Sequence, residues 1–232
     1  MEVVLKGGAR VELTGDARII TPGEIKTLLE PGEFGCMVDW EVKDPKTNLI
    51  TAKNSKKSES FVRQFIEMLY LLMTQRGTNY GYLAGIRDIY GRPRIGLAMS
   101  RTFECVASAG DITKGIVIGT GTDVATINDY RLQTIVQSGT GSGQVQYSAV
   151  IFGSPAYDST TSQFTITRNF ANASGGLIIA TEIGLYTWLL RTDHGNSDVD
   201  YMAMTIRDVI PGGISIPDGQ TLTVNYRPQA VI

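Results

Sequence analysis

The C-terminal part of the chain carries short segments in which apolar and polar residues alternate. The alternation is regular in FTITRN at 164–169 and in TLTVNY at 221–226. From residue 82 onward such segments recur about every ten to twenty residues, separated by Gly, Asn, Asp, Ser and Thr. A period of two is typical of strands that turn one face toward a core. We therefore expect a mainly β protein, with an antiparallel β-sandwich over residues 82–232; a related barrel is the alternative that the same pattern allows.

The first part of the chain is also predicted to be extended. In residues 34–43 apolar residues occupy alternate positions, and DPKTN at 44–48 is typical of a turn between two strands. We predict an extended N-terminal arm and a hairpin over residues 1–56.

Residues 57–81 are predicted to form one α-helix and a linker. Ser58 is a suitable N-cap and Gly77 a suitable terminator. The helix is amphipathic at first and almost fully apolar in its second half, so it must be covered on most sides. It either belongs to the core of the N-terminal half or packs between copies of the protein. The apolar positions expected to make these contacts are Phe61, Phe65, Leu69 and Leu72.

Composition excludes some partners. The formal net charge is −2 and charged residues make up 19% of the chain, against about 25% in typical globular domains. Lys and Arg are scattered, without the basic stripe of nucleic-acid-binding proteins, and no apolar run is long enough for a transmembrane helix. We expect neither nucleic acid nor a membrane as partner. Cys36 and Cys105 lie in no ligand-spaced pair and are expected to be ordinary buried or half-buried thiols.

No motif for catalysis, a cofactor or a metal ion is complete. The GxG at 119–121 lacks the helix start and the Lys-Ser/Thr that a phosphate-binding loop requires. Residues 196–207 begin like an EF-hand loop, but Tyr201 stands where a glycine is needed and Arg207 where a glutamate is needed. The single histidine, His194, accompanies no nucleophile motif. We expect no enzyme activity, no cofactor and no metal site. The 193–201 loop is expected to be a solvated turn, and a lower-order calcium or sodium site there is the alternative.

One carboxylate, Glu182, lies in the strongly β-prone segment LIIATEIGLYTWLL. It could be a catalytic acid, a metal ligand or a polar anchor for a loop. An isolated buried charge is costly, so we interpret Glu182 as an anchor that accepts hydrogen bonds from the backbone of the 172–176 turn or pairs with Arg168 or Arg207. Gly184, two residues on, would permit a bulge or a close backbone approach.

The same region resembles a known group of proteins. The segment ITRNFANASGGLIIATEIGLYT, followed by YMAMTIRDVI and ISIPDGQTLTVNY, resembles virion structural proteins of tailed bacteriophages. Its EIGLY sequence is similar to that in the N-terminal attachment domains of phage tail fibres. Upstream, KGIVIGTGTDVATINDYRLQTIV and SESFVRQFIEMLYLLM also resemble segments of such proteins, so the similarity spans residues 58–232.

The resemblance implies a β-rich subunit that is present in several copies and binds other virion structural proteins without performing chemistry. Such a protein is made in the host cytoplasm and ends in the phage particle as a homo-oligomer. No catalytic or ligand residue is carried over by the resemblance. The matched positions are expected to define the fold, and they are Thr167, Arg168, Asn169, Asn172, Gly176, Glu182, Gly184, Leu185 and Tyr186.

The favoured hypothesis is a non-enzymatic tail or neck protein that attaches subunits to one another or to fibres. A capsid decoration protein is the alternative within the same class. A carbohydrate-binding receptor-recognition module is the alternative of another class, because several aromatic residues in or near expected loops could stack on sugar rings. These aromatic residues are Tyr80, Tyr82, Tyr90, Tyr157, Trp188 and Tyr201.

Overall fold

The computed structural model describes only part of the chain. It describes residues 2–4, 10–12, 29–30, 33–58, 61–62, 64–65, 68, 87–91, 104–192 and 198–231. Among these, only the backbone is described for residues 2–4, 10–12, 157, 189–192 and 198–201. Within these residues the protein is mainly β and its sheets are antiparallel, which confirms the predicted fold class at that level.

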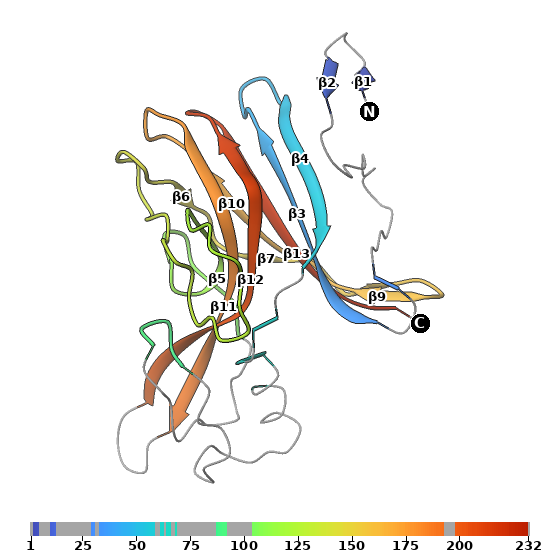
Figure 1. Cartoon of the computed structure of the whole chain (residues 1–232), viewed down its shortest axis with the longest axis vertical. Helices are drawn as coiled ribbons and strands as arrows, with labels where there is room; N and C mark the ends of the chain where they lie inside the picture. Colours follow the sequence, from blue (N-terminus) through green and yellow to red (C-terminus); the bar gives the residue numbers. More distant parts are fainter. Residues whose placement is uncertain are drawn as a thin grey trace.

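The larger sheet has eight strands, and its main path follows the order β4-β3-β13-β10-β6 (Figure 1). β7 pairs with β10, and β9 pairs with both β13 and β8. The central pair is long: ten residues of β13 pair with ten of β3, from Thr221 opposite Lys43 to Ala230 opposite Phe34. The strands are β3 Phe34–Lys43, β4 Ile50–Lys57, β6 Gln146–Tyr147, β7 Ile151–Phe152, β8 Ala156–Tyr157, β9 Thr161–Gln163, β10 Ile166–Ala171 and β13 Thr221–Val231.

A second sheet has three strands in the order β12-β11-β5. β5 spans Gly115–Gly119 and is buried throughout, whereas β11 Ile178–Thr192 and β12 Asp198–Ile216 form a long antiparallel pair. Their register shifts between Ala180 and Glu182 and again between Leu185 and Tyr186. A separate pair of short strands, β1 Glu2–Val4 and β2 Arg10–Glu12, completes the described elements.

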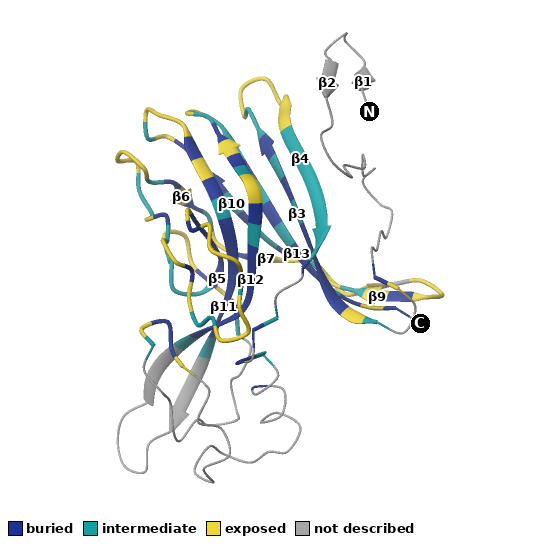
Figure 2. Cartoon of the chain, in the orientation of Figure 1, coloured by how far each residue is buried: buried dark blue, intermediate teal, exposed yellow. Residues whose placement is uncertain are grey.

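One apolar core joins the two sheets. In β10 and in most of β13 buried residues alternate with half-buried ones, as the sequence pattern predicts for strands with one face in a core. Figure 2 shows the buried residues concentrated along the middle of the packed strands. The Tyr226 hydroxyl of the larger sheet lies 3.4 Å from the Ile183 carbonyl of the smaller one. Core residues from both sheets include Val38, Phe170, Val224, Ile116, Ile183, Leu185 and Ile206.

The predicted hairpin at 44–48 is confirmed and connects β3 to β4. The Asp44 carboxylate accepts a hydrogen bond from the Lys46 amide at 2.8 Å, and the Asp44 carbonyl accepts one from the Asn48 amide at 2.8 Å. Asn48 has a φ of 59°, a left-handed conformation that Asn adopts more readily than most residues. The hairpin places two strands of the N-terminal part in the same sheet as the C-terminal β10 and β13.

The helix predicted within residues 57–81 falls mostly outside the described residues, and the described part of the chain contains no helix with defined bounds. The few described residues of that range lie against β12. Phe61 forms an isolated bridge with Ile206, and the Val62 amide donates to the Thr205 carbonyl at 3.1 Å. The position of Leu69 and Leu72 is likewise outside the described residues.

The rings of Phe61 and Phe65 lie 4.4 Å apart and both stack near the ring of Phe34, at 6.4 and 6.5 Å. Phe34 is 62% exposed. This aromatic cluster therefore joins the start of β3 to the segment that follows β4, although the ring of Phe34 keeps a large solvent-facing surface.

Candidate functional site

Glu182 is fully buried in β11, and its carboxylate binds backbone amides of the loop that follows β5. Its Oε1 atom accepts hydrogen bonds from the amides of Gly121 and Thr134, both at 3.0 Å. Its Oε2 atom accepts one from the Gln133 amide at 3.2 Å. The carboxylate thus fixes both ends of the loop that follows β5.

Arg207, on β12, completes the charge arrangement around Glu182. Its Nε atom donates to Glu182 Oε2 at 3.0 Å, and its Nη1 atom donates to Asp129 Oδ2 at 2.7 Å. Its Nη2 atom lies 2.9 Å from Glu182 Oε2 and donates to the Asp123 carbonyl at 3.2 Å. We call Glu182, Arg207 and Asp129 the Glu182 cluster. It ties two neighbouring strands to the middle of the loop.

The pKa values in the cluster follow from burial and from these contacts. Burial opposes ionisation of Asp129, but hydrogen bonds from the Thr126 amide and from Arg207 outweigh it, and the pKa of Asp129 lies below its ordinary value. Burial likewise disfavours the charged form of Arg207, yet its bonds to Asp129 and Glu182 raise the pKa of its guanidinium. The cluster therefore favours the ionised form of both groups.

The two glycines of the GxG at 119–121 leave space for the Glu182 carboxylate. A Cβ added to Gly119 would lie 2.5 Å from Glu182 Oε1 and 2.6 Å from the Thr134 carbonyl oxygen. A Cβ added to Gly121 would lie 2.6 Å from the same Glu182 oxygen. Both glycines let the backbone approach the carboxylate closely, which gives the motif a structural explanation that the sequence analysis missed.

Gly184 and Tyr186 contact the same loop. A Cβ on Gly184 would lie 3.0 Å from Leu132, so this glycine provides the close approach that was predicted, while the nearest register shift comes after Leu185. The buried Tyr186 hydroxyl accepts a hydrogen bond from the Leu132 amide at 2.8 Å. Burial raises the pKa of Tyr186. Glu182, Gly184 and Tyr186 of the EIGLY segment therefore act together on one loop.

The predicted interpretation of Glu182 is correct in its main point and wrong in one detail. Of the two proposed partners, Arg207 pairs with Glu182. The backbone amides come from Gly121, Gln133 and Thr134, and not from the 172–176 turn. That turn precedes β11, whereas β5 lies directly beside β11, with Gly119 opposite Glu182 in the register.

Arg168, on β10, is the second buried arginine and has a different environment. Its guanidinium donates to five backbone carbonyls, those of Ser108, Asp111, Lys114, Ile116 and Ser148, at 2.6 to 3.1 Å. Its central carbon lies 4.8 Å from the centroid of the Tyr147 ring. Burial lowers the pKa of Arg168. Arg168 thus fastens the 108–116 segment to the larger sheet.

Asn172 fixes the turn between β10 and β11. Its Nδ2 atom donates to the carbonyls of Gly176 and Ile216, at 2.8 and 2.7 Å. Its Oδ1 atom accepts hydrogen bonds from the Ser174 amide and hydroxyl, at 3.0 and 2.7 Å. The turn at 172–176 is therefore the third loop, after those bound by Glu182 and Arg168, whose backbone is held by one buried polar side chain.

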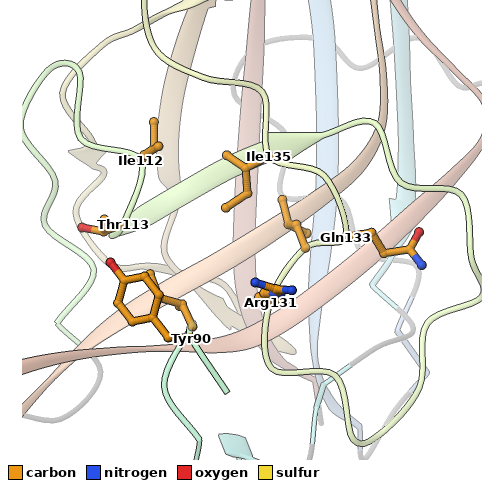
Figure 3. A pocket seen from close by; sticks show the side chains of 8 residues that line it. Tyr90, Ile112, Thr113, Arg131, Gln133 and Ile135 are labelled. Carbon is orange, nitrogen blue, oxygen red and sulfur yellow. The ribbon is translucent and has the colours of Figure 1, made fainter. Parts of the chain in front are cut away.

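A shallow pocket of about 240 Å³ lies beside the loop that the Glu182 cluster holds (Figure 3). Its floor is apolar, with buried Ile89 and Leu132 and half-buried Ile112 and Ile135. Its rim carries Tyr90, Thr113, Arg131 and Gln133.

The rim of this pocket combines an aromatic ring with a cation. Tyr90 is 64% exposed, and the exposed Arg131 makes no ion pair with any described residue. The Arg131 guanidinium lies 5.6 Å from the ring centroid of Tyr130. Figure 3 shows the Gln133 side chain directed away from Tyr90, and it bonds Asp123 instead. Tyr90 and Arg131 are therefore the rim groups best placed to meet a ligand.

The remaining candidates are distributed over the molecule. Phe61 and Phe65 join Phe34 in the aromatic cluster. Of the aromatic residues proposed to bind sugar, Tyr90 lines the pocket and Trp188 lies under the Lys114 ammonium, which is 5.9 Å from the ring centroid. The side chains of Tyr80, Tyr82, Tyr157 and Tyr201 lie outside the described residues, as does the loop that contains His194.

Cys36 and Cys105 are free and buried, as predicted, and burial raises the pKa of the Cys105 thiol to about 11. The described residues contain no group of three or more His, Cys, Asp or Glu side chains that could hold a metal ion. In the same part of the chain, no helix is long and apolar enough to cross a membrane. Comparison of the chain with protein-family models, with curated proteins and with solved structures gave no match.

Proposed function

We propose that this chain is a non-enzymatic structural component of a tailed phage particle, a tail or neck protein built on a β-sandwich. The observation that carries the proposal is the environment of Glu182. A general acid or a nucleophile needs an oxygen within reach of a substrate. Glu182 is 0% exposed, and both of its oxygens accept hydrogen bonds from the protein.

The other buried polar groups support the same proposal. Arg168 and Asn172 also direct their hydrogen bonds to backbone atoms of loops. Three loops are thereby held in one shape on the surface of the sheets. Rigid, preorganised loops favour binding to other proteins because little conformational entropy is lost on association. The resemblance of residues 58–232 to virion proteins supplies the proposed partners, which are other subunits of the particle.

Quantitative mass spectrometry of purified particles of the source phage tests this proposal. We expect the full chain in the particle at the low copy number of a tail or neck ring. A copy number comparable with that of the capsid protein would support the decoration protein instead. The proposal fails if the chain is absent from particles, or if the purified protein turns over a substrate and loses this activity on substitution of a single carboxylate.

A carbohydrate-binding module is the second candidate, and the pocket at Tyr90 favours it. An exposed aromatic ring above an apolar floor suits the apolar face of a sugar ring, and the Arg131 cation suits a sugar carboxylate. The volume of about 240 Å³ is small for a ligand site and corresponds to a single sugar unit.

Binding of purified full-length protein to a panel of neutral and acidic glycans tests this candidate. If it is right, Tyr90→Ala abolishes binding and Arg131→Gln weakens binding of acidic sugars by about tenfold, the effect of about 1.4 kcal/mol. The matched control is Ile127→Ala, since Ile127 is 64% exposed and lies in the same loop but does not line the pocket. Absence of glycan binding by the wild-type protein removes this candidate.

A further inference from the structure

The two sheets differ in how their outer edges are covered. The outer edge of β12 meets residues of its own chain. The amides of Val62 and Ile89 donate to the carbonyls of Thr205 and Met202, at 3.1 and 2.9 Å. Lys56 Nζ also donates to the Val209 carbonyl at 3.2 Å. By contrast, β4 pairs only with β3 among the described strands, and it forms the edge of the larger sheet (Figure 1).

The register identifies which backbone groups of β4 face outward. The Ser58 amide donates to the Cys36 carbonyl at 2.8 Å, so at that point even-numbered residues bond toward β3. Alternate residues of an antiparallel strand turn their backbone groups to opposite sides. The amides of Lys53, Ser55 and Lys57 therefore point away from β3. The Ser55 amide is bonded by the Asn54 side chain at 2.8 Å, which leaves those of Lys53 and Lys57 open within the described structure.

The lysines of β4 do not protect this edge as edge lysines usually do. An unpaired ammonium on an edge strand opposes strand addition because it would have to leave water. Here Lys53 lies 3.5 Å from Glu41, Lys56 lies 3.6 Å from Asp208, and Lys57 lies 2.7 Å from Glu33. Each charge is already neutralised within the chain, so an incoming strand meets an edge of low net charge.

The two N-terminal strands form a small sheet of their own among the described strands. β1 and β2 pair with each other over three residues and with no other described strand. An isolated two-stranded hairpin is marginally stable in water. Strands of this kind gain stability by joining a larger sheet.

We propose that an N-terminal strand of a second copy of this chain adds to the open edge of β4. This inference rests on the proposed function, which requires a subunit that assembles with other copies. It identifies the contact between two copies as one between an N-terminal strand and β4. The 16 residues from 13 to 28, between β2 and the buried Leu29, would span at most about 55 Å when extended, enough to reach a neighbouring subunit. Strand addition uses main-chain hydrogen bonds for affinity, and the low net charge of the β4 edge does not oppose it.

The test measures the oligomeric state of the full-length protein by sedimentation velocity over a range of concentrations. Lys53→Pro removes an outward amide and leaves the β3–β4 hydrogen bonds intact, because this amide does not face β3. We expect Lys53→Pro to raise the dissociation constant of the oligomer at least about tenfold. The matched control, Lys53→Ala, keeps the amide and should assemble like the wild type. Circular dichroism verifies that both variants are folded.

Disulfide trapping identifies the occupant of the edge. Two differently tagged copies, one with Val11→Cys and one with Ser55→Cys, should form a mixed disulfide on oxidation. The proposal is overturned if the wild type is a monomer or if Lys53→Pro leaves the oligomer unchanged. It is also overturned if a Val11→Cys/Ser55→Cys double variant forms its disulfide only within one chain. These results leave the proposed function standing if the chain is still found in particles, so the two failures are distinguishable.

Discussion

The two buried arginines fasten loops to the two sheets by different means. Arg168 in the larger sheet is surrounded by five backbone carbonyls and the face of Tyr147. Arg207 in the smaller sheet is held by the carboxylates of Glu182 and Asp129 and by one carbonyl. Both side chains are almost completely buried.

The difference shows what each arginine contributes. Carbonyl dipoles compensate Arg168 only in part, and the lowered pKa of its guanidinium reflects burial without a carboxylate in contact. Arg207 gains from opposite charges, and its pKa is raised. Losing Arg168 removes hydrogen bonds together with a costly buried charge. Losing Arg207 leaves the Glu182 carboxylate buried without a counter-ion.

The largest effect is expected for Arg207→Met. An uncompensated buried charge costs about 3–5 kcal/mol when one partner of a buried pair is removed. Unfolding in urea should show a loss of this size in the free energy of unfolding. The double variant Glu182→Gln/Arg207→Met removes both charges and should recover part of that loss. Equal stability of the double and single variants would contradict the importance of the unpaired carboxylate.

A smaller loss, of about 2–3 kcal/mol, is expected for Arg168→Met, because it leaves buried carbonyls without donors but also removes the burial cost of the charge. Arg168→Lys should be nearly as destabilising as Arg168→Met, since a lysine ammonium cannot reach five carbonyls in the planar arrangement of a guanidinium. Urea unfolding measures both variants. Wild-type stability in Arg168→Lys would show that charge, and not geometry, matters at this site.

Gly119→Ala is expected to perturb the Glu182 cluster by steric contact alone, without removing a charge. The added Cβ would meet Glu182 Oε1 and the Thr134 carbonyl oxygen at 2.5 and 2.6 Å, and overpacking of this kind costs about 1–3 kcal/mol. Gly176→Ala is the matched control, because no atom lies within 4 Å of a Cβ there. Thermal unfolding should separate the two variants, and a similar transition temperature for both would contradict the close packing.

The smallest effect concerns pH and distinguishes the two arginines. The pKa of Asp129 is lowered in the folded state. Its contribution is therefore complete above the unfolded pKa, near 4, and is lost as pH falls through the lower folded value. The difference in unfolding free energy between wild type and Asp129→Asn, about 0.2–1 kcal/mol at neutral pH for a partly exposed ion pair, should shrink as the pH falls below about 4.

The corresponding difference for Arg168→Met should change less over the same pH range, because Arg168 bonds only carbonyls and the Asp111 carboxylate acts on it without a hydrogen bond. Urea unfolding at pH 7 and at several values below pH 4 measures both differences. An equally strong pH dependence of the Arg168→Met difference would show that a carboxylate matters as much to Arg168 as it does to Arg207.

Local patterns in the sequence predicted much of the fold. Alternation of apolar and polar residues in β10 and in most of β13 predicted the face that each strand buries. The DPKTN turn joined β3 to β4 as expected, because Asp44 can bond the turn backbone and Asn48 tolerates a positive φ. These features depend on neighbouring residues only, so they are readable without the tertiary structure.

Charge complementarity also narrowed the partners of Glu182 to two arginines, but it could not choose between them. The choice depends on strand register. Arg207 lies opposite Gly184 in the β11–β12 pair, two residues along the strand from Glu182, so the two side chains are diagonal neighbours. Arg168 lies in the other sheet, where it serves a different loop.

The sequence by itself determined that this protein is mainly β, where several of its strands and one hairpin lie, and that Glu182 must be compensated if it is buried. These conclusions follow from side-chain periodicity, turn chemistry and the cost of a buried charge, which are local or general. Only the tertiary structure decided that Gly119 and Gly121 make room for a carboxylate, that Asp129 joins Arg207, and that β4 lies at an edge. Each of these depends on which distant segments are neighbours, and pairing between distant strands is not encoded in any short stretch of the chain.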